Sequence, residues 1–90
     1  MARWYRSDGN AERIYQVLAQ HGATVVRLGR PMDALVILGD RMVLVDPKGS
    51  KQSPIRPAQA KLLALFPDLC FLLYDETDGI ELLKRLRSAR

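Results

Sequence analysis

Two short apolar runs separated by a turn constrain the fold of this chain more than any other feature of its sequence. They cover residues 33–38 and 42–46, and residues 39–41, which begin with a glycine, join them. Both runs are rich in β-branched residues, which is typical of strands, and the glycine favours a turn. The sequence therefore predicts a β-hairpin. Because antiparallel pairing brings the start of one strand beside the end of its partner, we expect Asp33 and Asp46 to meet.

The rest of the chain alternates between helical and extended patterns. Asn10 is a good N-cap for a first helix, and Asp78, with Glu81 three residues later, forms a capping-box pattern for a last helix. Besides the hairpin, we expect helices over 11–21, 57–66 and from 79 to near the end, and strands over 23–28 and 69–74. The order α-β-β-β-α-β-α predicts an α/β fold with a mixed central sheet flanked by helices. Residues 1–9 are expected to form a loosely ordered arm.

Length and composition limit the class of protein. A chain of 90 residues predicts a single domain over 1–90 with a modest core, for which dimerisation would add stability. Cys70 is the only cysteine, so no internal disulfide can form, and no apolar stretch is long enough to span a bilayer. These features predict a cytoplasmic protein without a membrane partner. The formal net charge of +4 leans weakly toward polyanionic partners.

The chemistry of the hairpin end points to phosphodiester hydrolysis. Side chains alternate faces along a strand, so Asp46 and Lys48 share a face if the strand stays regular. Two carboxylates can hold a hard divalent cation such as Mg²⁺, which lowers the pKa of a bound water, while the amine orients that water or neutralises the phosphate. A plain turn is the alternative for residues 46–50, because Asp, Pro and Gly all favour turns.

The element order, together with Asp…(Asp/Glu)-x-Lys across the hairpin, resembles the PD-(D/E)XK nuclease superfamily. Residues 9–13, Gly-Asn-Ala-Glu-Arg, resemble the Gly-x-x-Ala-Glu-Arg start of archaeal-type Holliday junction resolvases. Residues 25–27, Val-Val-Arg, and residues 32–36, Met-Asp-Ala-Leu-Val, resemble two later steps of the same family. The minimal VRR-NUC nucleases share much of this layout. The resemblance covers roughly residues 9–74 and implies a restriction-endonuclease-like core.

The resemblance also implies an activity and its residues. It implies a DNA endonuclease that depends on Mg²⁺, with Mn²⁺ as a substitute, and that prefers branched DNA such as Holliday junctions. Glu12, Asp33 and Asp46 would bind the metal, and Lys48 would be the catalytic amine. The enzyme would be a homodimer, because resolving a four-way junction needs two symmetric nicks. Glu12 also has a simpler interpretation as a solvated first-turn acid, since it lies about 160° from the centre of the apolar helix face.

Four basic residues are expected to hold DNA phosphates that flank the cut. Arg13 and Arg27 match basic residues of the resolvase family, and Lys51 and Arg56 lie in a stretch without acidic residues. Contacts of this kind give affinity but little sequence specificity. Gln59 would reach the site from the following helix. Arg27 alternates with apolar neighbours, so an ordinary solvent-facing role is equally compatible with the sequence. A glutamine placed as Gln59 is, however, more often a plain surface residue.

Two departures from the family pattern leave other functions open. Asp46 replaces the commoner Glu and shortens the reach to a metal, and Pro47 replaces an apolar strand residue just before Lys48. A catalytically silent DNA-binding module on the same fold is therefore one alternative. A minimal VRR-NUC-type nuclease that acts on flaps or nicked duplex is the other.

Overall fold

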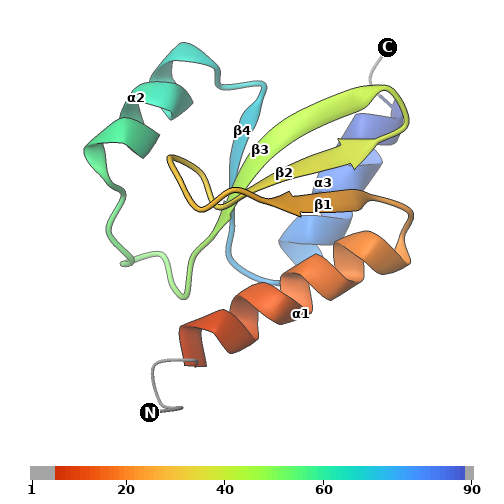
Figure 1. Ribbon diagram of the computed structural model, residues 1–90, viewed down its shortest axis with the longest axis horizontal. Coiled ribbons are helices and arrows are strands. Elements are labelled where there is room, and N and C mark those ends of the chain that lie inside the picture. The colour runs from red at the N-terminus through yellow and green to blue at the C-terminus, as the bar shows by residue number, and fades with distance from the viewer. Residues whose placement is uncertain (1–5, 89–90) are drawn as a thin grey trace.

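The computed structural model describes residues 6–88, including the side chains of residues 10–88. Figure 1 shows three helices around one sheet. The elements in chain order are α1 (Arg6–Gln20), β1 (Thr24–Arg27), β2 (Ala34–Leu38), β3 (Arg41–Pro47), α2 (Pro57–Leu65), β4 (Cys70–Leu73) and α3 (Glu76–Ser88). This order is the predicted α-β-β-β-α-β-α. Within residues 6–88, each helix is too short or too polar to cross a bilayer.

The sheet is mixed, as the sequence predicts. Its four strands lie in the order β1-β2-β3-β4. The first two pairings are antiparallel, and β3 pairs with β4 in parallel. The predicted hairpin is the β2–β3 pair, in which Ala34 lies opposite Val45. Because α2 connects two parallel neighbours, β3 and β4, it serves as the crossover that such a pairing requires.

Helices α1 and α3 cover one face of the sheet. They pack against each other and, in Figure 1, α3 lies behind the strands. Alternate strand residues such as Val36, Val43 and Val45 face these helices and are buried. Ile14 and Leu18 of α1, which are fully buried, complete the core together with α3. The predicted apolar face of the first helix is therefore the face that builds the core.

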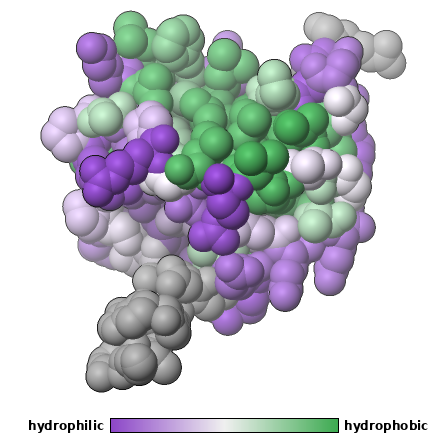
Figure 2. Space-filling model, in the orientation of Figure 1, coloured by the Kyte–Doolittle hydropathy of each residue, from purple (hydrophilic) through white to green (hydrophobic). Residues whose placement is uncertain are grey.

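The opposite face of the sheet is largely bare. Val26 and Met42 lie on it, on β1 and β3, and are 41% and 56% exposed. Figure 2 shows the face turned toward the viewer in Figure 1, where apolar side chains gather in one broad area. The large exposed apolar residues are Val26, Leu28, Met42, Ile55, Leu65, Phe66 and Leu69. An uncovered apolar area of this kind is unusual for a small monomer.

Two predicted helix starts are wrong. Helix α1 begins at Arg6, so residues 6–9 are helical rather than loose and Asn10 is not an N-cap; residues 1–5 of the expected arm lie outside the described residues. The apolar pattern begins only where α1 meets the core, so it cannot reveal the turn before it. Helix α3 begins at Glu76 instead of near 79. Asp75 accepts the Asp78 backbone N–H at 2.8 Å, which is the capping contact that had been assigned to Asp78.

Leu83 tests the packing between the helices and the covered face. Its side chain is fully buried in the core cluster, so Leu83→Ala is expected to lower the free energy of unfolding by about 2–5 kcal/mol. Urea denaturation followed by circular dichroism measures this loss. Leu65→Ala is the matched control, because Leu65 is 58% exposed and its removal should change stability by less than about 0.5 kcal/mol. Equal losses in the two variants would contradict the described core.

Candidate functional site

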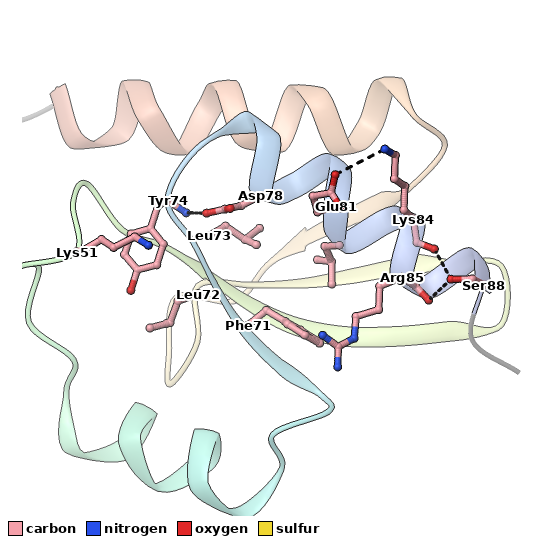
Figure 3. Close-up of a pocket in the computed structure, with 11 residues that line it drawn as sticks. Lys51, Phe71, Leu72, Leu73, Tyr74, Asp78, Glu81, Lys84, Arg85 and Ser88 are labelled. Carbon is pink, nitrogen blue, oxygen red and sulfur yellow. Dashed lines mark hydrogen bonds and ion pairs between the residues drawn. The ribbon is translucent and has the colours of Figure 1, made fainter.

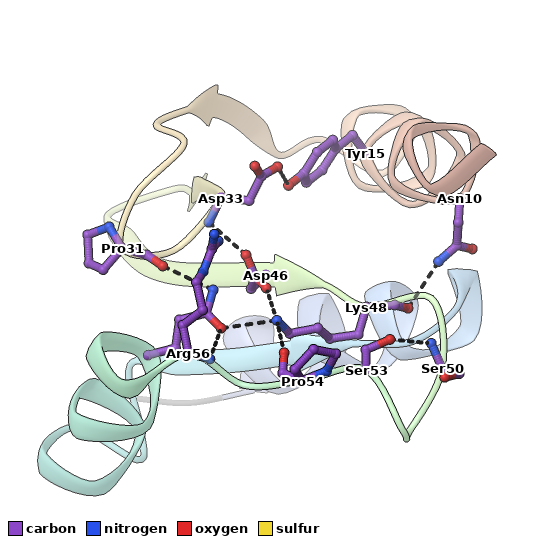
Figure 4. Close-up of polar contacts among 11 residues, drawn as sticks. Asn10, Tyr15, Pro31, Asp33, Asp46, Lys48, Ser50, Ser53, Pro54 and Arg56 are labelled. Atoms are coloured by element: carbon purple, nitrogen blue, oxygen red, sulfur yellow. Dashed lines mark hydrogen bonds and ion pairs between the residues drawn. The ribbon is translucent and has the colours of Figure 1, made fainter. Parts of the chain in front are cut away.

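The hairpin brings Asp33 and Asp46 together as predicted. Asp33 directly precedes β2, and Asp46 lies near the end of β3. The backbone N–H of Asp33 donates a hydrogen bond to Asp46 Oδ1 at 3.1 Å (Figure 4). Asp46 is only 5% exposed, whereas the Asp33 side chain is 29% exposed. The pair therefore has one carboxylate anchored inside the protein and one open to solvent.

Lys48 points toward Asp46 despite the intervening proline. Its ammonium Nζ lies 2.8 Å from Asp46 Oδ2. Pro47 is the last residue of β3, and the pairing with β4 continues beyond it, because the Lys48 backbone N–H donates to the Leu73 carbonyl at 2.9 Å. The regular strand keeps Asp46 and Lys48 on one face, and the chain does not form an independent turn at this point. The Asp46 carboxylate, the Lys48 amine and the Asp33 backbone N–H thus meet at one end of the hairpin, whereas the Asp33 carboxylate points toward Tyr15 of α1 (Figure 4).

Gln59 belongs to this cluster. Its side chain is fully buried, and its Oε1 accepts a hydrogen bond from Lys48 Nζ at 3.0 Å. Its Nε2 donates to the Pro31 carbonyl at 3.1 Å. The Lys48 ammonium also donates to the Pro54 carbonyl at 3.0 Å. Each of its three N–H groups therefore has an acceptor, and the loop before α2 is attached to the site.

Tyr15 of α1 holds the other side of Asp33, a contact that sequence reasoning missed. Its hydroxyl donates to Asp33 Oδ2. Burial raises the pKa of Tyr15 well above its usual range, and the hydrogen bond to Asp33 adds to this shift, so the hydroxyl keeps its proton. The sequence does place Tyr15 beside Ile14, at the edge of the apolar face of the helix. A buried tyrosine hydroxyl usually finds a polar partner, so this position could have indicated a hydrogen bond.

Arg27 links the cluster to Glu12. Its Nε lies 3.3 Å from Asp33 Oδ2, and its Nη1 lies 3.2 Å from Glu12 Oε2. Its guanidinium also lies over the Tyr15 ring, 4.6 Å from the ring centroid. Burial alone would lower the pKa of Arg27, but the adjacent carboxylates of Asp33 and Glu12 outweigh this and raise it. Glu12 therefore joins the site through an arginine.

The donor set limits the kind of metal that the site can hold. Among the described residues, no three His, Cys, Asp or Glu side chains lie close enough together to hold an ion. Asp33 and Asp46 supply two carboxylates at the end of the hairpin, where the Asp33 backbone N–H binds Asp46 Oδ1. Two carboxylates fit Mg²⁺, which commonly keeps several waters and uses one or two protein carboxylates beside a phosphate. The metal role predicted for Glu12 stays a prediction.

The other residues predicted to hold phosphates lie on α1 and on the segment between β3 and α2. Arg13 and Arg56 are exposed, on α1 and just before α2. Lys51 Nζ lies 5.2 Å from the centroid of the Tyr74 ring, in a hollow between β4 and α3 (Figure 3). Neither Asp33 nor Asp46 lines that hollow. Arg27 is thus the residue of this group that touches the carboxylates.

Asn10, expected to cap α1, instead reaches the end of the sheet. Its amide Nδ2 donates to the Lys48 carbonyl at 3.2 Å and to the Tyr74 carbonyl at 3.5 Å. These carbonyls follow β3 and β4, where the strands leave the sheet. The amide therefore fixes α1 beside the strand that carries Asp46 and Lys48.

Comparisons with known proteins do not identify this arrangement. A scan against protein-family models finds none that matches, and searches of curated proteins and of solved structures find no significant match.

The buried pair of Asp46 and Lys48 makes a stability prediction. Asp46→Ala leaves the Lys48 ammonium buried without its carboxylate, which should lower the free energy of unfolding by about 3–5 kcal/mol. Adding Lys48→Met removes that buried charge and should restore most of the loss. Urea denaturation of both variants measures the difference. A double variant that is as unstable as Asp46→Ala would show that the ion pair does not carry the effect.

Proposed function

We propose that this protein is a metal-dependent DNA endonuclease with a restriction-endonuclease-like core. The observation that carries the proposal is the convergence of Asp33, Asp46 and Lys48 at one end of the hairpin. Asp33 and Asp46 come from different strands, and the buried Gln59 and the Pro54 carbonyl hold the Lys48 amine beside the Asp46 carboxylate. Two carboxylates can hold a divalent cation, and the cation and the amine can stabilise the negative charge that develops when a phosphodiester is hydrolysed.

The residues divide the work of hydrolysis between them. Asp33 and Asp46 would hold Mg²⁺. When bound, this ion would lower the pKa of a coordinated water and neutralise charge on the phosphate. In the proposed reaction the Lys48 ammonium exchanges one of its three protein acceptors for the scissile phosphate or the attacking water, which it orients beside Asp46. The water oxygen bonds to phosphorus, the ester bond breaks, and the leaving oxygen takes a proton. Gln59 fixes Lys48 for this task without touching the substrate.

Branched DNA is the preferred substrate in this proposal. The net charge of +4 and the exposed Arg13 and Arg56 supply attraction to phosphates without sequence reading. Among DNA substrates, the resemblance to Holliday junction resolvases favours a four-way junction. Flaps and nicked duplex are the alternatives, because minimal VRR-NUC-type nucleases share the layout.

Cleavage of synthetic DNA tests the proposal. With Mg²⁺ or Mn²⁺, purified protein should cut a four-way junction faster than flap, nicked duplex or single-stranded DNA. Asp46→Asn keeps the shape of the side chain but removes its charge. It should slow cutting more than about 100-fold, because metal-assisted charge stabilisation contributes several kcal/mol. Gel analysis of cleavage products gives the rates.

The control and the opposing outcomes follow from the same assay. Asp40→Asn removes an exposed carboxylate from the hairpin turn and should cut as fast as the unaltered protein. Equal cutting by Asp46→Asn would rule out the proposed site. Salt-sensitive junction binding without any metal-dependent cutting would instead support a catalytically silent DNA-binding module.

The proposed enzyme acts as a homodimer through the bare face of the sheet. Val26, Leu28 and Met42 provide an exposed apolar surface there, and symmetric nicking of a junction requires two sites. Met42→Lys places a charge on this face and should convert a dimer to a monomer in analytical ultracentrifugation. Gln16→Lys adds the same charge to an exposed position on α1 and should leave the dimer intact. A monomeric unaltered protein would contradict this part of the proposal.

A further inference from the structure

A single cation, the Arg27 guanidinium, engages two of the carboxylates considered above. It lies 3.3 Å from Asp33 Oδ2 and 3.2 Å from Glu12 Oε2. These two acids come from the start of β2 and from α1, and Arg27 ends β1 between them. A positive charge therefore stands where the sequence pattern expects carboxylates to meet a metal.

The contacts bind one oxygen of the Asp33 carboxylate to protein donors. Asp33 Oδ2 accepts from the Tyr15 hydroxyl and also pairs with Arg27. A divalent cation and a guanidinium compete for the same carboxylate, because each draws on the same negative charge and they repel each other. Tyr15 is neutral and buried, so it adds no such repulsion. Of the contacts to Asp33, Arg27 is therefore the one that opposes metal binding, as Lys48 does at Asp46.

The contacts of Arg27 with Asp33 and Glu12 are weak enough to be exchanged for others. The Arg27 side chain is 49% exposed and that of Glu12 is 59% exposed. The ion pairs of Arg27 are therefore accessible to solvent and individually weak. The long side chain ends in a planar fork that suits phosphate as well as carboxylate. A residue with weak contacts and a second suitable partner can exchange one for the other.

We propose that Arg27 couples metal binding to DNA binding: it pairs with Asp33 and Glu12 in the resting protein and turns to a DNA phosphate when the carboxylates take a divalent cation. This inference rests on the proposed nuclease function. It assigns one residue two successive partners, which differs from a fixed phosphate contact. Because coupling between two ligands is reciprocal, the metal should strengthen DNA binding and DNA should strengthen metal binding by the same factor.

Removing the arginine should change the two affinities in opposite directions. In calorimetric titration with Mn²⁺ alone, Arg27→Ala should bind the ion about three- to tenfold more tightly, since two exposed ion pairs are lost. Binding to a four-way junction should weaken, and its salt dependence should fall by about one phosphate contact. Fluorescence anisotropy with Ca²⁺ or with EDTA measures DNA binding and its dependence on a divalent cation.

Two further variants separate the proposed exchange from general electrostatics. Arg30→Ala removes an equally exposed charge three positions along the chain and should leave the Mn²⁺ affinity nearly unchanged. Arg27→Lys keeps the charge but lacks the fork that reaches both carboxylates, so its Mn²⁺ affinity should fall between those of the unaltered protein and Arg27→Ala. Urea denaturation should show that these exposed substitutions leave the protein folded.

The outcomes distinguish this inference from the function on which it rests. If Arg27→Ala binds Mn²⁺ no more tightly than the unaltered protein, or no more tightly than Arg30→Ala, the exchange is wrong while the nuclease proposal stands. If Arg27→Ala keeps the full strengthening of DNA binding by Ca²⁺, the coupling is likewise wrong. If neither the unaltered protein nor any variant binds Mn²⁺ in a manner that depends on Asp33 and Asp46, both proposals fail together.

Discussion

The ion pair between Asp46 and Lys48 organises the functional end of this small fold. Both residues are almost completely buried, so each charge requires its partner. The Lys48 ammonium also binds Pro54 and Gln59, which attaches the loop and α2 to the sheet. Asp46 in turn accepts the backbone N–H of Asp33 at the neighbouring strand. One buried interaction thus connects β2, β3 and the crossover to β4.

Helices cover only one face of the sheet, so its two faces differ in the residues that they carry. Helices α1 and α3 provide the core, and the residues that face them are aliphatic. Next to Asp33, where α1 meets β1, lie Arg27 and Tyr15. Asp46 lies on the opposite face of the sheet, and Gln59 reaches Lys48 from α2. The site therefore lies where the two sides of the sheet meet, at the end of the hairpin. The buried pair of Asp46 and Lys48 belongs to the candidate site and also contributes to stability.

Local patterns in the sequence predict the sheet well and the helix starts poorly. The hairpin and the shared face of Asp46 and Lys48 follow from strand periodicity, which persists through Pro47. The second helix follows from Pro57 and the apolar residues after it. The first turn of α1 carries no apolar repeat, so the pattern misplaced its start. The contacts of Tyr15 and Asn10 join α1 to distant strands and depend on how α1 packs, which periodicity cannot supply. Burial of Gln59 likewise depends on α2 folding back so that Gln59 meets Lys48 and the Pro31 carbonyl.

The amide of Asn10 has a consequence for how the chain assembles. Its two acceptors, on Lys48 and Tyr74, are 38 and 64 positions away along the chain. Such non-local closures are slow because a long loop must be ordered before the contact forms. The end of the sheet that carries the acidic residues therefore closes only after the C-terminal half has been synthesised. A nascent chain that has emerged only as far as β3 would lack this closure, so the end of the sheet that carries the candidate site is completed late in biosynthesis.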